Sequence, residues 1–204
     1  MSQLTIAEPP SSSKVWLYEM GDVVTLPYVN ELNSKFFPEE LLCVLYARMR
    51  KEQLVDLVFH SEKGYTLNDF VAEMRTKCPL IHMQRAGDRL EEVIGFSWLP
   101  TIEGNPGQRK ATIGFCCFRH TGPARTHAAG MLALRWYFKE LNIDVIMGAI
   151  YKHNKLALRY AKALNFKVIA DIPKFLPSLD GLQTAVLVML ERGEFLASDS
   201  RPKM

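Results

Sequence analysis

The residues from position 119 to 130 have the composition of a binding site for an anionic ligand. Arg119, Gly122, Arg125 and Gly130 lie in the stretch RHTGPARTHAAG, between a strand-like segment and a helix-like one. The free N–H groups and positive dipole end of a helix N-terminus attract phosphate, and small residues let the backbone approach it. The stretch predicts phosphate binding by backbone N–H groups around Gly122 to Thr126, helped by Arg119 or Arg125. The alternative is an ordinary strand-to-helix loop with solvated arginines.

Cysteine and histidine side chains near this loop are further candidates for chemistry. Cys116 and Cys117 are adjacent, but no nearby base is identifiable, and a cysteine in an apolar strand usually packs inertly. His120 and His127 flank the loop, and either is a candidate general base because histidine titrates near neutrality. Contact with phosphate or solvent is the alternative. The four cysteines form no C-x-x-C pair and no histidine has metal-ligand spacing, so we expect reduced cysteines and no metal site.

A second informative segment begins at Asn154. Its side-chain oxygen can cap the first turn of a helix. Apolar residues then recur at helical spacing, at Ala157, Leu158, Ala161 and Leu164. Asn165 tolerates the left-handed conformation of a helix C-terminal cap. The pattern predicts a strand ending at Ile150, a helix from Asn154 and a strand from Phe166.

This segment resembles the end of the GNAT superfamily of acetyl-coenzyme A-dependent N-acyltransferases. That family typically has N-x-x-A, then an aromatic residue, then Gly-Phe at the start of the next strand. Asn154, Ala157 and Phe166 stand at the usual offsets, and Asn165 replaces the glycine. The resemblance implies that acetyl-coenzyme A (acetyl-CoA) is the co-substrate.

The resemblance extends to the loop described first. The family's pyrophosphate signature, [RQ]-x-x-G-x-[GA], is matched from Arg119 to Ala124 and, with its first glycine replaced, from Arg125 to Gly130. The family also pairs the backbone of the preceding strand with the pantetheine arm, much as an added strand would pair. The cofactor-binding residues implied by the resemblance are Cys117, Phe118, Arg119, Gly122, Arg125, Thr126 and Asn154.

By the same resemblance, a strand glutamate acts as the base and a tyrosine of the last helix acts as the acid. Ala161 occupies the usual tyrosine position, and Tyr160 stands one residue early, about 100° round the helix. Tyr160 is the candidate acid, Tyr151 is another, and aromatic packing is the alternative for both. Glu92 opens a central strand and is the candidate base, with Glu91 beside it. An exposed charge at a strand end is the alternative.

The elements that must position these residues alternate along the chain. We expect a strand over 15–20, helices over 25–32 (with Thr25 as N-cap), 39–59 and 66–77, strands over 80–84, 92–99 and 111–118, a helix over 126–141, and a last strand over 184–190. The later part of 39–59 could equally be a strand. This order predicts an α/β protein, a GNAT-like three-layer fold with a mixed, mostly antiparallel central sheet flanked by helices. We expect one domain over 15–195 and flexible tails over 1–14 and 196–204.

Bulk composition excludes several classes of partner. The 204 residues are 48% hydrophobic and 23% charged, as in a soluble globular protein with one core. The net charge is only +3, and no basic stripe interleaves with aromatic residues, so no nucleic-acid partner is expected. No apolar run reaches signal-peptide or membrane-spanning length, which predicts a cytoplasmic protein without a membrane partner. The oligomeric state is left open, a homodimer included.

Two functions follow from the resemblance. The favoured one is an acetyl-CoA-dependent N-acetyltransferase acting on a primary amine of a small molecule or a protein. The other is a non-catalytic GNAT-fold protein with a binding or assembly role. The displaced tyrosine, the W-Y-F cluster over 136–138 and Ile172-Pro173 resemble GNAT-like proteins of tailed bacteriophages, some of which are carried with virion structural genes. For such a protein the location would be the host cytoplasm or the virion.

Overall fold

The computed structural model describes residues 18–28, 40–61, 63–77, 79–87 and 89–199. The strands are β1 (Tyr18–Met20), β2 (Val23–Pro27), β3 (Leu80–Ala86), β4 (Arg89–Trp98), β5 (Ile102–Glu103), β6 (Lys110–Thr112), β7 (Gly114–Cys117), β8 (Val145–Tyr151), β9 (Lys167–Leu176) and β10 (Gln183–Glu191). The helices are α1 (Glu40–Lys51), α2 (Val55–Val58), α3 (Leu67–Lys77), the 3-10 helix η1 (Arg119–Thr121), α4 (Gly122–Lys139), α5 (Lys155–Ala163) and α6 (Arg192–Asp199).

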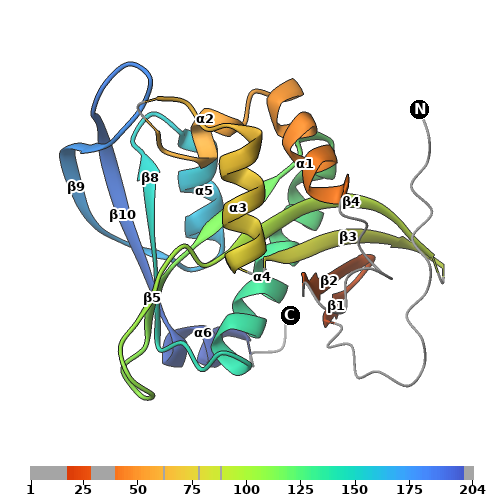
Figure 1. The fold of residues 1–204 in the computed structure, drawn as a ribbon. Coiled ribbons are helices and arrows are strands. Elements are labelled where there is room, and N and C mark those ends of the chain that lie inside the picture. The colour runs from red at the N-terminus through yellow and green to blue at the C-terminus, as the bar shows by residue number, and fades with distance from the viewer. Residues whose placement is uncertain (1–17, 29–39, 62, 78, 88, 200–204) are drawn as a thin grey trace.

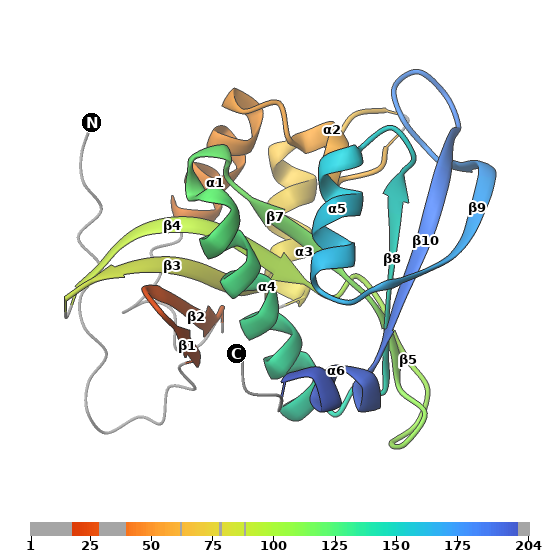
Figure 2. The same cartoon turned by 180° about the vertical axis from the view of Figure 1, so that it is seen from behind.

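The strands form two sheets with helices on both faces. One sheet has the order β1-β2-β3-β4-β7 and the other the order β5-β6-β8-β10-β9. Helices α1, α2 and α3 lie on one side of the strands, and α4 and α5 lie on the other (Figures 1 and 2). Every described strand pair is antiparallel except β6 with β8. The expected α/β fold with a mixed, mostly antiparallel sheet between helices is confirmed.

The strand expected over 111–118 is divided at Ile113 between the two sheets. Its first part, β6, pairs with β8, and its second part, β7, pairs with β4. One continuous segment therefore belongs to both sheets and joins them. The sheets separate immediately after Ile113, and that separation creates the candidate site.

The helix expected over 25–32 is wrong for its described part, because Val23–Pro27 form β2. Gly21 has a φ of +63°, which suits the tight turn that joins β1 to β2 as a hairpin. β2 is buried on both faces and pairs with β3 along its whole length. Burial between sheet neighbours thus outweighs the local helix signal at Thr25 and Pro27. Residues 29–32 lie outside the described part.

Other helix limits depend on local caps. The stretch expected as one helix over 39–59 divides into α1 and α2 at Gln53, which has a φ of +56°. Thr66 caps α3: its hydroxyl accepts the N–H of Asp69, whose carboxylate accepts the N–H of Thr66 at 2.9 Å. Residues 196–199, expected in a flexible tail, belong to α6, because Arg135 of α4 binds both carboxylate oxygens of Asp199.

Candidate functional site

The backbones of β7 and β8 diverge and leave a gap between the two sheets. The last hydrogen bond before the gap joins the Ile113 N–H to the Met147 carbonyl at 2.9 Å. Farther along, β7 pairs with β4 and β8 pairs with β10, and no strand pairing joins the described residues of β7 and β8. Each strand therefore presents one unpaired edge to the gap. Such edges can bind an extended ligand in the way that they would bind another strand.

A cavity of about 160 Å³ occupies this gap. Its lining is mainly apolar, with a few polar groups, as is usual for small-molecule sites. The strands contribute Ile113, Gly114, Phe115, Gly148, Ala149, Ile150 and Val188, and the helical side contributes Leu57, Val58, His60, Gly130, Leu134, Asn154, Ala157, Tyr160, Ala161, Leu164 and Phe166.

The cavity reaches both faces of the sheet. Successive side chains of a strand point to opposite faces, and Ala149 and Tyr151 of β8 pack with Leu176 and Ala185, whereas Ile150 packs in the cluster that contains Ala161 of α5. Residues of α2 line the cavity on one face and residues of α5 line it on the other. Two ligands could therefore meet in the gap from opposite sides.

Asn154 and Tyr160 lie together on the α5 side of the cavity. Asn154 caps α5, since its Oδ1 accepts the Ala157 N–H at 3.1 Å, as predicted. The Tyr160 ring stacks on Phe115 of β7 with 4.9 Å between centroids. Its hydroxyl donates to the Thr126 carbonyl at 2.8 Å, so it is directed to α4. Burial raises the pKa of Tyr160 well above 10, and the phenol keeps its proton at neutral pH.

Gly130 of α4 makes room for this tyrosine hydroxyl. A Cβ at position 130 would lie 2.0 Å from the Tyr160 oxygen and 2.7 Å from Leu164 Cδ1. Only glycine leaves enough space for α5 to pack here on α4. The residue that the sequence analysis assigned to a phosphate signature therefore has a packing role.

The loop between β7 and α4 holds the other predicted cofactor ligands. Gly122, with a φ of +76°, leads from η1 into α4, and the Thr126 hydroxyl donates to the Gly122 carbonyl. Arg125 binds the Asp22 carboxylate of the β1–β2 turn through Nε and Nη2, each at 2.7 Å. The Arg119 N–H donates to Oε2 of Glu52 at 2.7 Å. A carboxylate of this chain thus occupies the backbone N–H of Arg119, which precedes the N–H groups of the predicted phosphate site.

Glu92, the predicted base, belongs to a charged cluster at the same loop and is not among the residues that line the cavity. Its two carboxylate oxygens lie 3.1 Å from Arg48 Nη1 and from His120 Nε2. Arg48 also pairs with Glu52, and its guanidinium covers the buried Phe118 ring at 4.2 Å from the centroid. The cluster joins α1 to the start of α4, away from the gap.

Cys116 and Cys117 of β7 are held as thiols. Burial raises the pKa of Cys117 to about 12 and that of Cys116 well above its ordinary value. The thiolate is the nucleophilic form of cysteine, so these two side chains act as packing residues in β7. Cys117 packs against the apolar cluster that includes Ile94 of β4 and Ala129 of α4.

His60 is a cavity residue that sequence reasoning missed. It follows α2 on the face opposite Asn154 and Tyr160, and its ring makes a T-shaped contact with the Tyr151 ring, with 4.6 Å between centroids. Burial lowers the pKa of His60 below its ordinary value, so the ring is neutral at neutral pH. The sequence LVDLVFH contains no motif that distinguishes this histidine. Only the tertiary packing of its ring against Tyr151 of β8 brings it to the gap.

Two further classes of site can be assessed for the described residues. Those residues contain no group of three or more His, Cys, Asp or Glu side chains suited to a metal ion. None of the described helices is long and apolar enough to cross a membrane.

Known proteins resemble this chain in structure. No family model and no curated protein matches the sequence. Ribosomal-protein-S5-alanine acetyltransferase from Vibrio fischeri superposes with a TM-score of 0.66 at 15% identity, covering 88% of this chain and 98% of its own. RimJ from Mycobacterium smegmatis, in complex with CoA-disulfide, has a TM-score of 0.65 at 14% identity, over 88% and 90%.

Spermidine N-acetyltransferase from Vibrio cholerae, in complex with CoA and spermine, has a TM-score of 0.66 at 13% identity, covering 86% of this chain and 98% of its own. A structure named as a GNAT-family acetyltransferase, from Bacillus anthracis, superposes with a TM-score of 0.60 at 11% identity, over 87% and 99%. This chain has the fold of the GNAT acetyltransferases.

Proposed function

We propose that this protein is an N-acetyltransferase that transfers the acetyl group of acetyl-CoA to a primary amine. The observation that carries the proposal is the gap between β7 and β8, with its two unpaired strand edges and its apolar cavity. The pantetheine arm is an extended chain with amide groups, so it can pair with a strand edge. The acetyl thioester would then lie in the cavity, shielded from water by Phe115 and Tyr160.

Access from both faces of the sheet suits a reaction between two substrates. The donor would enter on the α5 side, where the N-terminus of α4 offers backbone N–H groups to the pyrophosphate. The amine would enter on the α2 side and meet the thioester in the gap. Holding the two reactants in contact supplies much of the rate enhancement of an acyl transfer. Spermine and an alanine-initiated peptide are suitable probe amines, because spermidine and S5-alanine acetyltransferases share the fold.

The test is a cavity-filling substitution with a matched control. Ala157 lines the cavity from α5, whereas Ala163 of the same helix is exposed and lies outside the lining. We expect Ala157→Phe to abolish the heat of acetyl-CoA binding in calorimetry, and Ala163→Phe to retain it. Circular dichroism checks that both variants fold. If the natural protein gives neither heat nor a thermal shift with millimolar acetyl-CoA, the proposal is wrong.

A second candidate function is supported by the hydrogen bond between Glu52 and the Arg119 N–H. A carboxylate at this donor competes with a pyrophosphate, and the Arg125 guanidinium is already bound to Asp22. These contacts favour a non-catalytic protein with a binding or assembly role. Failure of both the natural protein and Glu52→Gln to bind acetyl-CoA would support this alternative over the enzyme.

A further inference from the structure

His60 differs from Asn154 and Tyr160, two other polar residues of the cavity lining, in the side of the cavity that it lines and in the hydrogen bonding of its side chain. It lines the cavity from the α2 side, opposite the side on which Asn154 and Tyr160 lie. Asn154 and Tyr160 both use their side chains in hydrogen bonds to the backbone. Within the described residues, neither ring nitrogen of His60 has a hydrogen-bond partner. An acceptor substrate that enters from the α2 side would therefore meet a ring with an available lone pair.

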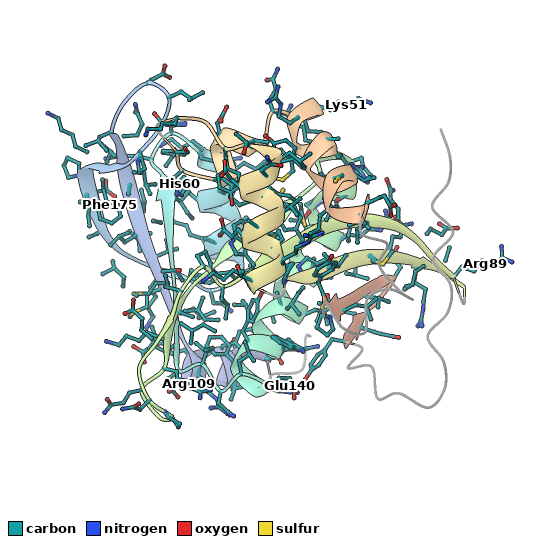
Figure 3. All side chains as sticks on the ribbon, in the orientation of Figure 1. Lys51, His60, Arg89, Arg109, Glu140 and Phe175 are labelled. Atoms are coloured by element: carbon teal, nitrogen blue, oxygen red, sulfur yellow. The ribbon has the colours of Figure 1, made fainter. Side chains whose placement is uncertain are left out.

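Rigid neighbours fix the position of His60. The preceding residue, Phe59, is buried and stacks between Tyr65 at 4.1 Å and Trp98 at 4.9 Å. On the other side, the imidazole rests on Tyr151 of β8, whose hydroxyl donates to the Pro177 carbonyl at 2.5 Å. Figure 3 shows His60 near the end of β8. A catalytic group needs this kind of support to keep its geometry during the reaction.

We propose that His60 is the general base that deprotonates the acceptor amine. This inference rests on the proposed function and assigns one step of it to a residue. An amine such as a lysine side chain is protonated at neutral pH, since its ordinary pKa is about 10. It must lose a proton before its nitrogen can attack.

The proton and electron balance of the step is complete with these groups. His60 takes one proton from the ammonium group and later releases it to solvent. The nitrogen lone pair forms the new C–N bond with the thioester carbonyl carbon. The C–S electron pair leaves with the sulfur, and a second proton from the attacking nitrogen ends on that sulfur. The products are the N-acetylated amine and the free thiol.

The surroundings of His60 suit this role. The titratable groups of this region are Tyr151 from β8, whose ring contacts the imidazole, His153, whose ring stacks on Tyr151 with 5.1 Å between centroids, and Asp56 from α2, whose charge acts on Tyr151. Burial keeps the imidazole neutral and able to accept a proton at neutral pH. The charge of the Asp56 carboxylate acts on the Tyr151 ring that contacts His60, and it would also attract a positively charged amine. On the far side of the cavity, Tyr160 is a protonated phenol.

The test compares His60→Gln with His153→Gln. The His153 ring also stacks on Tyr151, but His153 is exposed and does not line the cavity, so its substitution is a matched control. Thiol release from acetyl-CoA is measured with spermine and with an alanine-initiated peptide, from pH 5 to 9. We expect His60→Gln to lower kcat about 100-fold, the lower end of the usual range for general base catalysis. His153→Gln should stay within about twofold of the natural protein.

Three further measurements distinguish a general base at position 60 from a residue that only packs there. The acidic limb of the kcat profile should be lost in His60→Gln, added imidazole should restore part of the rate, and acetyl-CoA affinity should be unchanged. An unchanged kcat, or a fall without imidazole rescue and with an unchanged pH profile, would refute the role of His60 and leave the proposed function standing. Absence of acetyl-CoA binding to the natural protein would instead refute the proposed function.

If neither amine reacts, hydrolysis of bound acetyl-CoA gives the same comparison, because water then takes the place of the amine. We expect this slower thiol release to show the same loss in His60→Gln. A natural protein that binds acetyl-CoA but releases no thiol by either route would overturn the assignment of His60 as a base.

Discussion

Glu52 offers the most direct test of the predicted phosphate site. Its Oε2 accepts the Arg119 N–H at 2.7 Å, and its Oε1 lies 3.2 Å from Nε of Arg48. The side chain is only 17% exposed, so solvent screens its charge incompletely. Binding of a pyrophosphate at this loop must displace the carboxylate or tolerate a negative charge beside it. We therefore expect Glu52→Gln to tighten acetyl-CoA binding.

The size of the effect follows from the charges in contact. Two like charges about 4 Å apart repel by roughly 1 kcal/mol in bulk water and roughly 4 kcal/mol at the effective dielectric of a protein surface. Arg48 offsets part of that repulsion because it pairs with Glu52 and also with Glu92. The glutamine can still accept the Arg119 N–H. A net gain of about 1.4 kcal/mol remains as a central estimate, which corresponds to roughly tenfold tighter binding.

Isothermal titration with acetyl-CoA measures this change, and Glu92→Gln is the control. Glu92 contacts the same arginine but no backbone N–H of the loop in the described structure. Loss of its charge should change affinity by less than about threefold. The Glu52 variant should also be slightly less stable because an Arg48 contact is lost, so stability and affinity should move in opposite directions. Equal affinities for the natural protein and Glu52→Gln would show that the pyrophosphate does not bind at this loop.

Two predictions concern hydrogen bonds inside the protein. Tyr160→Phe should lower the free energy of unfolding by about 0.5–1.5 kcal/mol, measured by urea denaturation, because the hydrogen bond from the phenol to the Thr126 carbonyl is lost. A kcat that falls 100-fold with unchanged stability would instead identify Tyr160 as the acid. Burial lowers the pKa of His82 to about 3, while the ring contacts the Thr25 hydroxyl at 2.9 Å and the Ser97 hydroxyl at 3.1 Å. The unfolded chain binds the proton first, so His82 stabilises the fold above about pH 6.5, and this contribution should fall by up to about 1.4 kcal/mol per pH unit between pH 6.5 and 3. His82→Gln should weaken the dependence of the free energy of unfolding on pH in this range. An equal dependence in the variant would show that His82 does not cause it.

Features held by local chemistry could be predicted from the sequence. The cap at Asn154 is a contact over three residues, and Asn165 adopts its left-handed φ of +66° as an intrinsic preference. The start of α3 at Thr66 is also a local capping contact. Such contacts join residues that are close in the sequence, so a short sequence pattern can predict them. The α/β order followed from the same kind of signal, whereas the GNAT fold was implied by the resemblance of residues 154–166 to that family.

Features held by distant neighbours could not be predicted in this way. The strand 111–118 divides at Ile113 because β6 has β8 beside it and β7 has β4, and neither partner is specified locally. Glu52 reaches the Arg119 N–H across 67 positions of the sequence. His60 becomes a cavity residue only because its ring packs against Tyr151 of β8. Each of these contacts determines the position or the hydrogen bonding of a residue at the site, yet none corresponds to a recognisable sequence motif.

The displaced tyrosine illustrates how packing and chemistry constrain one another. A shift of one position turns a helical side chain by about 100°, and at Tyr160 this turn directs the hydroxyl to the Thr126 carbonyl, across the surface of Gly130. The glycine and the tyrosine then fit only as a pair, because a methyl group at position 130 would collide with the phenol oxygen. A phenol used in this way has no free proton for a departing thiolate. The reaction still balances without it, since an ammonium substrate carries two protons to lose: one that His60 can accept, and one that the sulfur can take.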